Sequence, residues 1–296
     1  MKFDLILSNP PFQDVENRGK TRHKLWIDFT MKSLSEWLRP GGTLCQVSPA
    51  SFRSPSSPVL EAMRALQTEW IDFDIRDNFP GIGSTFATYS ITNTLHSGSS
   101  QVFTDHGAVA ISLDRAVPYL PLDTPGGLEV HRKVMWLPQE KLPVHSDYVT
   151  AHNIKRRTTK TVSETQTEQH IYPVFHTNNK TWWSSIKPPC LERKKVVFTR
   201  SGYFRPFFDS GTLGVTDMSY FVYVDGDVEG SNLVHNLNSL LIRYILRTTQ
   251  WSGFTHEMIL QSMPNLPTSI AMSDEDMFLR FGLNAAEVAH VQSIMG

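Results

Sequence analysis

The chain has 296 residues, enough for two domains and a substantial core. Its composition is globular, with 40% hydrophobic and 19% charged residues, and the formal net charge of −1 argues against a uniformly basic, nucleic-acid-coating surface. The sequence has no run of about 18 apolar residues, so no membrane span is predicted. Its two cysteines, Cys45 and Cys190, provide neither a disulfide framework nor a zinc pattern. These features predict a cytoplasmic protein in a reducing compartment.

Residues 1–98 alternate between strand and helix patterns. Strands are predicted at residues 2–8, 43–49, 70–79 and 85–95, and helices at 23–38 and 57–70. The sequence RPGG at residues 39–42 is a typical helix-stop signal. Because strands separated by helices favour a parallel or mixed sheet, this part of the chain is predicted to be an α/β domain.

The remainder of the chain has a different character. Residues 99–150 are rich in proline and are predicted to be an irregular linker that includes a strand pair. A second, α+β domain is expected over residues 151–296. Within it, residues 232–248 have the apolar spacing of one helix, and the tail predicts two short helices capped by Ser273 and Asn284.

The start of the second domain is strongly basic. Residues 151–205 contain eleven lysines and arginines against three glutamates, with aromatic residues interleaved. This pattern favours contacts with DNA phosphates and base edges, although a charge run can also be a solvated face. The residues predicted to bind DNA are Lys155, Arg156, Arg157, Lys160, Arg193, Lys194, Lys195 and Arg200.

The most informative stretch is Asn9-Pro10-Pro11-Phe12, which follows the first predicted strand directly. Both prolines have φ locked near −65° and lack a donor N–H, so the corner is rigid. An Asn-Pro-Pro-aromatic sequence after an apolar strand resembles the fourth motif of the N6-adenine amino-methyltransferases. Such a motif is short, and it also occurs in methyltransferases that act on glutamine side chains or on RNA.

The resemblance implies a specific chemistry for these residues. The amino nitrogen of adenine is a poor nucleophile, and two oxygen acceptors for its hydrogens make it more electron-rich. Asn9 would supply a side-chain acceptor, Pro10 a main-chain acceptor aimed by Pro11, and Phe12 a stacking platform for an adenine flipped out of double-stranded DNA. Direct transfer from S-adenosylmethionine would follow. The alternative is a proline turn that ends the strand and packs Phe12 into the core.

Longer segments extend the resemblance to the gamma-class N6-adenine DNA methyltransferases of restriction–modification systems. Residues 70–92 resemble their eighth motif, in which Phe79 would be a second ring beside the flipped base; core filling is the alternative for Phe79. Segments from residue 196 onward resemble their target-recognition domain. The implied fold is the C-terminal half of a Rossmann-like methyltransferase sheet over residues 1–98, followed by a linker and a DNA target-recognition domain over residues 151–296.

One part of the family pattern is not found in the sequence. The Gly-rich turn that cradles S-adenosylmethionine should open a helix, whereas PGIGS at residues 80–84 precedes a strand. We therefore expect the cofactor to be bound mainly by a partner chain, or not at all. In that case the apolar strand at residues 2–8 lies at a sheet edge, which a partner chain or a second copy must cover.

The sequence leaves two functions open. The chain is either the catalytic and recognition portion of a split DNA adenine methyltransferase, or an inactive pseudo-methyltransferase that binds DNA or protein. The intact sequence Asn9 to Phe12 favours the first function, and the missing cofactor turn favours the second for the chain alone.

Overall fold

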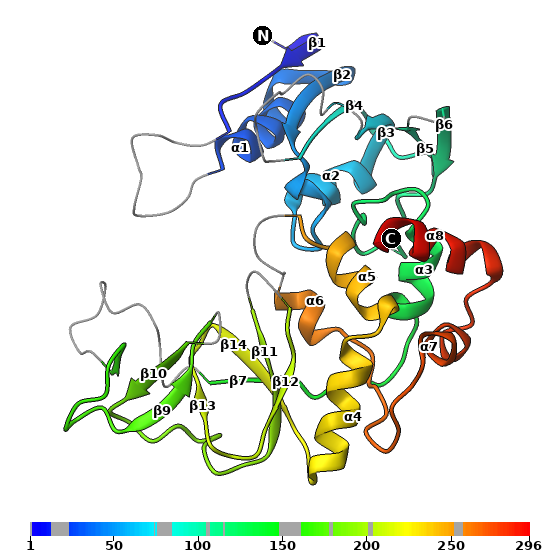
Figure 1. Cartoon of the computed structure of the whole chain (residues 1–296). Coiled ribbons are helices and arrows are strands. Elements are labelled where there is room, and N and C mark those ends of the chain that lie inside the picture. The colour runs from blue at the N-terminus through cyan, green and yellow to red at the C-terminus, as the bar shows by residue number, and fades with distance from the viewer. Residues whose placement is uncertain are drawn as a thin grey trace. The chain divides into compact units, whose positions relative to one another are not determined.

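The computed structural model describes residues 2–12, 24–73, 75, 85–104, 107–114, 116–147, 161–177, 180–200, 204–251 and 257–296. The chain forms two compact units, residues 1–128 and 129–296, which are described separately. Figure 1 shows the course of the chain through both of them. The functional boundaries predicted near residues 98 and 150 stay a prediction.

The first unit is built on one mixed six-stranded sheet. Its strands are β1 (Phe3–Ser8), β2 (Leu38–Pro49), β3 (Leu66–Asp72), β4 (Phe86–Leu95), β5 (Ser100–Thr104) and β6 (Gly107–Ile111). Their order across the sheet is β1-β2-β4-β3-β5-β6. β1 and β2 are parallel, as are β3 and β5, whereas β4 is inserted antiparallel between β2 and β3. The predicted mixed α/β architecture is confirmed, including a strand pair, β5 and β6, after residue 99.

Helices cover one face of this sheet. They are α1 (Leu25–Lys32) with a π-helical turn (Ser33–Trp37), a short 3-10 turn (Ala50–Arg53) and α2 (Pro58–Ala65). Figure 1 shows α1 and α2 beside the sheet. Trp26 of α1, Leu60 of α2 and Ile91 of β4 are buried in the same hydrophobic core. Each connection from β1 to β2 and from β2 to β3 therefore forms a strand–helix–strand unit.

Two boundaries in the first unit differ from the sequence-based expectation. The sequence RPGG does not separate helix from strand, because β2 already begins at Leu38 and contains all four residues. The helix predicted to reach residue 70 ends at Ala65, and Leu66 begins β3. The segment 66–70 has apolar residues that fit either period, and pairing with β4 decides in favour of a strand.

A buried polar network joins helix and sheet beside the end of β1. The side-chain amide of Gln46 donates to Thr30 Oγ1 at 2.6 Å and to the Tyr89 hydroxyl at 3.0 Å. Gln46 is also the register partner of Ser8, the last residue of β1. Burial raises the pKa of Tyr89 to about 12, despite opposing hydrogen bonds from Thr30, Ser48 and Gln46, so its hydroxyl stays neutral.

The strand β1 lies at one edge of the sheet and carries exposed apolar side chains. In the described residues it pairs only with β2, and Leu5 and Leu7 are 53% and 73% exposed. They alternate with Ile6, which packs against the core. The expectation that residues 2–8 form an apolar edge strand is confirmed.

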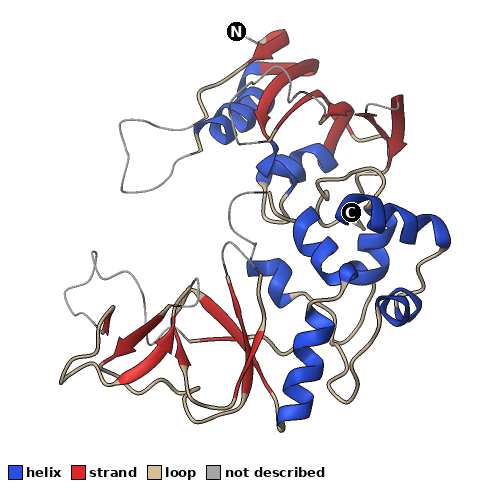
Figure 2. Cartoon of the chain, viewed as in Figure 1, coloured by secondary structure: helices blue, strands red, loops and turns tan. Residues whose placement is uncertain are grey.

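The second unit contains two small sheets and a group of helices, which Figure 2 distinguishes by colour. The strands of the first small sheet are β8 (Val162–Ser163), β9 (Tyr172–Phe175), β10 (Thr181–Ser184) and β13 (Gly214–Val215). Those of the second are β7 (His145–Ser146), β11 (Lys195–Thr199), β12 (Phe207–Asp209) and β14 (Ser219–Tyr223), in the order β12-β11-β14-β7. β11 therefore lies inside its sheet, and all five of its residues are buried.

The helices of the second unit are α3 (Leu128–His131), a π-helical turn (Arg132–Trp136), α4 (Asp227–Leu237), α5 (Leu240–Thr248), α6 (Glu257–Gln261), α7 (Asp274–Arg280) and α8 (Ala285–Met295). The prediction of a single helix over residues 232–248 is wrong. The helix is interrupted between α4 and α5, where the Ser239 side chain caps α5. The predicted caps Ser273 and Asn284 are confirmed, each within a capping box. None of the helices in the described ranges is long and apolar enough to cross a lipid bilayer.

Candidate functional site

The predicted catalytic corner lies at the carboxyl end of β1. In open α/β sheets, ligands bind outside the carboxyl ends of the parallel strands. Asn9 and Pro11 are exposed, whereas Pro10 is buried. No hydrogen bond ties the Asn9 side chain to another residue in the described part of the chain. The amide of Asn9 is therefore presented to solvent by a rigid bend whose first proline is anchored in the protein.

Phe12 is partly buried at the end of the same corner. It packs against the core of the first unit, and its ring centroid is 5.2 Å from that of Phe86, with the planes 34° apart. Phe86 opens β4, far from Phe12 in the sequence. This contact fixes the Phe12 ring from the side of the core.

A buried aromatic group with a stacked cation follows β2. The rings of Phe52 and Phe73 stack with centroids 6.2 Å apart, and the Arg53 guanidinium lies 3.3 Å from the Phe73 centroid. Burial lowers the pKa of Arg53 to about 9 although Asp123 opposes this shift, so the group stays charged at neutral pH. Arg53, Phe73 and Phe86 could not be predicted from the sequence, because only contacts between residues distant in the sequence identify them.

Half of the predicted DNA-binding residues lie outside the residues that the structure describes. Lys155, Arg156, Arg157, Lys160 and the second predicted stacking residue, Phe79, lie outside the described residues. Arg193 and Lys194 are exposed: Arg193 lies 3.4 Å from the centroid of the Tyr223 ring, and Lys194 pairs with Asp227 at 2.8 Å. Arg200 is partly exposed.

Lys195 contradicts its predicted role in DNA binding. Its side chain is 0% exposed, and its ammonium lies 2.5 Å from Asp209 Oδ2. It also donates to the main-chain oxygens of Cys190 and Arg193. Because β11 is an inner strand and Lys195 is its first residue, the side chain is held inside the domain and is not available to a phosphate.

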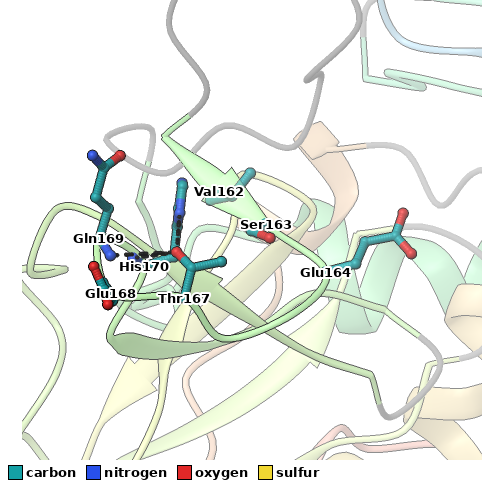
Figure 3. A pocket seen from close by; sticks show the side chains of 7 residues that line it. All are labelled: Val162, Ser163, Glu164, Thr167, Glu168, Gln169 and His170. Carbon is teal, nitrogen blue, oxygen red and sulfur yellow. Dashed lines mark hydrogen bonds between the residues drawn. The ribbon is translucent and has the colours of Figure 1, made fainter.

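A surface hollow of about 610 Å³ lies along residues 162–170 of the second unit. Figure 3 shows its lining side chains, which include Glu164, Glu168 and His170, with His170 hydrogen-bonded to Thr167. In the described residues no group of three or more metal-ligating side chains converges, here or elsewhere. The hollow contains none of the predicted catalytic residues.

Neither a family model nor a curated protein matches the chain. Among solved structures, the type IIL restriction-modification enzyme MmeI in complex with DNA is similar over 90% of this chain and 45% of that one, with 10% identity and a TM-score of 0.47. A DrdV–DNA complex is similar over 98% of this chain and 44% of that one, with 10% identity and a TM-score of 0.46.

The M protein of the type I restriction enzyme EcoKI is similar over 34% of this chain and 25% of that chain, with 18% identity and a TM-score of 0.28. The chain thus spans less than half the length of each of these three proteins.

The contrast between adjacent lysines gives a stability prediction. Lys195→Met leaves the buried Asp209 carboxylate without its cation, so the free energy of unfolding is expected to fall by about 3–5 kcal/mol. Lys194→Met removes only an exposed ion pair, for which about 0–1 kcal/mol is expected. Urea unfolding followed by circular dichroism measures both, and equal losses for the two variants would contradict the structural role of Lys195.

The ion pair between Lys195 and Asp209 also predicts how the stability of the protein depends on pH. Burial raises the pKa of Asp209, but hydrogen bonds from Lys195 and Thr212 and the Lys195 charge outweigh it, so this pKa lies below the ordinary value of 3.8. Such a group stabilises the folded state above the unfolded-state pKa, and this stability is lost as the pH falls through the folded value. The stability difference between wild type and Lys195→Met should therefore narrow below about pH 4 in acid unfolding experiments. A constant difference across this range would refute the assignment.

Proposed function

We propose that the chain is the catalytic and DNA-recognition portion of an N6-adenine DNA methyltransferase that acts together with a partner chain. The observation that carries this proposal is the solvent-presented amide of Asn9, which follows the parallel strand β1 directly and precedes the buried Pro10. A proline turn that only ends a strand would need no exposed hydrogen-bonding side chain at this position.

Each residue of the corner has a role in this reaction. The oxygen of the Asn9 side chain and the main-chain oxygen of Pro10 accept the two amino hydrogens of an adenine. These bonds would localise the nitrogen lone pair. S-adenosylmethionine, when bound beside the corner, would supply the methyl group, with its thioether as the leaving group. Catalysis rests on alignment and electrostatics, because the proton leaves only after the nitrogen has become cationic, and a strong base is not needed.

Phe12 is suited to hold the base in place. Its ring is supported by Phe86 on the side of the core and remains partly exposed. Stacking of a base on such a ring contributes about 1–3 kcal/mol, which offsets part of the free energy needed to unstack the adenine. Phe79 is proposed as a second ring at this site.

The cofactor and partner proposals rest on the edge strand. The sequence has no match to the Gly-rich cofactor turn that the resemblance requires, since PGIGS at residues 80–84 precedes the strand β4. The register partners Leu7 and Cys45 lie on the sheet face opposite the core, and Leu5 and Leu7 are largely exposed there. A partner polypeptide that adds strands beside β1 would cover these side chains and bring S-adenosylmethionine to the carboxyl end of β1, next to Asn9.

Replacement of Asn9 by alanine tests the catalytic proposal. The affinity-tagged chain is recovered with its partner from the native source, and methyl transfer to DNA is measured with radiolabelled S-adenosylmethionine. Asn9→Ala is expected to lower the transfer rate by about 100-fold or more, since one oriented acceptor is lost, while DNA binding stays nearly unchanged.

The matched control is Asn93→Ala, which removes a similar amide from the side of β4, where it donates to the Arg39 carbonyl. This variant should keep the wild-type rate. Retained transfer by Asn9→Ala would overturn the assigned role, and a wild-type assembly that binds DNA without methylating it would favour the pseudo-methyltransferase.

Charge placed on β1 tests the partner proposal. Leu7→Lys is expected to reduce recovered methylation activity by about tenfold or more, because a lysine would have to be desolvated at the interface. Leu95→Lys, at another site that is 87% exposed, should have no effect. The isolated chain should give no heat of S-adenosylmethionine binding in calorimetry. Full activity of Leu7→Lys, or tight cofactor binding by the isolated chain, would contradict the proposed assembly.

A further inference from the structure

A pocket in the second unit lies apart from the hollow of Figure 3 and has no role in the chemistry above. Its volume is about 480 Å³, within the range of small-ligand pockets. The lining residues are His145, Ser146, Asp147, Pro189, Cys190, Phe221 and Tyr223. Aromatic rings, a carboxyl group and a thiol therefore line one open pocket, beside β7, β14 and the turn before β11.

The aromatic side of the pocket is an ordered stack. Phe221 and Tyr223 are two residues apart on β14 and so share one face, with ring centroids 5.0 Å apart in an edge-on arrangement. His145 pairs with Phe221 in the strand ladder, and the two rings stack with centroids 5.6 Å apart and planes 24° apart. Phe221 is buried and His145 is exposed, so the imidazole is the outermost ring, available as a platform for another planar ring.

The deep side of the pocket is polar. Asp147 is 5% exposed, and its Oδ2 lies 3.9 Å from the thiol of Cys190, which is 1% exposed. Burial raises the pKa of Cys190 to about 11, so the thiol keeps its proton at neutral pH and acts as a weak donor to Asp147. Asp147 also interacts with residues other than Cys190. Because a carboxyl group has about four acceptor positions, it can accept from a ligand in addition to such partners.

The burial of Asp147 decides between two kinds of recognition. A side chain that reads a base pair in the major groove must project from the surface to reach the base edge. Asp147 is too deeply buried for that, whereas a single base removed from its stack is small enough to enter a pocket of this size. Next to the pocket, the exposed Arg193 lies on the Tyr223 ring, where its guanidinium suits a phosphate of the same nucleotide.

We propose that this pocket binds one unpaired nucleobase that carries an exocyclic amino group, with cytosine as the best fit. His145 stacks on the base, Asp147 accepts an amino hydrogen, and Arg193 contacts the backbone. Carboxylates pair with the amino group of cytosine by the same logic in groove recognition. The inference rests on the proposed action on DNA and adds to it a base-reading site that is separate from the corner at Asn9.

The test compares two single-stranded hexamers that differ only in the group read by Asp147. Fluorescein-labelled hexadeoxycytidylate and hexadeoxyuridylate are titrated into the full chain, with fluorescence anisotropy as the readout. The cytosine hexamer is expected to bind about tenfold more tightly, because uracil carries an oxygen in place of the amino group. Equal affinities, or binding of neither hexamer, would overturn the proposal.

Variants locate the preference in the pocket. Asp147→Asn should remove the preference, since an amide can donate to the uracil oxygen, whereas Glu192→Gln, an exposed carboxylate paired with Lys187, should retain it. His145→Ala should weaken both hexamers, and His145→Phe should restore them. A preference that survives Asp147→Asn would place the reading elsewhere and overturn the proposal. If Asp147→Asn fails to fold, the wild-type comparison of the hexamers still decides.

Two further measurements distinguish this proposal from a site for free nucleotides and from the proposed methyltransferase function. Deoxycytidine monophosphate should compete only at concentrations at least about tenfold above the hexamer, which has more phosphates for the protein to contact. Competition by the mononucleotide at equal concentration would assign the pocket to free nucleotides and overturn the DNA source. The proposed methyltransferase function fails on the Asn9→Ala assay, which leaves the hexamer ratio unchanged, whereas the pocket fails on that ratio alone.

Discussion

The parallel pairing of β1 with β2 is the constraint on which the geometry of the candidate active site depends. In the described residues β1 has no other strand neighbour, so its position is fixed by the register that places Ser8 beside Gln46. Gln46 is in turn held by Thr30 from α1 and Tyr89 from β4. A buried amide with these two partners allows little freedom, because a shift of register would leave polar groups unsatisfied in the core.

Packing interactions also explain why the corner at residues 9–12 exposes Asn9. Pro10 is buried and Phe12 packs on Phe86, so the bend is anchored on both sides of the exposed Pro11. Asn9 is the one residue of the bend that is both polar and exposed. Strand register, proline geometry and aromatic packing together place Asn9 at the surface, without any hydrogen bond to its side chain within the described part of the chain.

The sequence was sufficient for features that depend on local chemistry, and insufficient for those that depend on distant partners. The strand before Asn9, the strand 85–95 and the caps Ser273 and Asn284 follow from apolar alternation and capping preferences, which act over a few residues. The end of α2 was misplaced because pairing of β3 with β4 overrides the local helical spacing.

The burial of charged side chains was the least predictable property. Lys194 and Lys195 are indistinguishable as neighbours in a basic run, yet one is exposed and the other is fully buried beside Asp209. Asp209 is fourteen residues away in the sequence, and nothing local indicates the pairing. The pocket around Asp147 and His145 was missed for the same reason, because its rings come from strands that meet only in the folded sheet.

The exposed face of β1 has a consequence for how the strand can be altered. Among the described residues β1 pairs only with β2, and Leu5 and Leu7 are largely exposed on it. Such a strand can act as a template to which further extended chain adds, and apolar side chains strengthen that association. The tendency to associate therefore belongs to the same six residues that position the candidate corner, so truncating β1 to improve solubility would remove the corner as well.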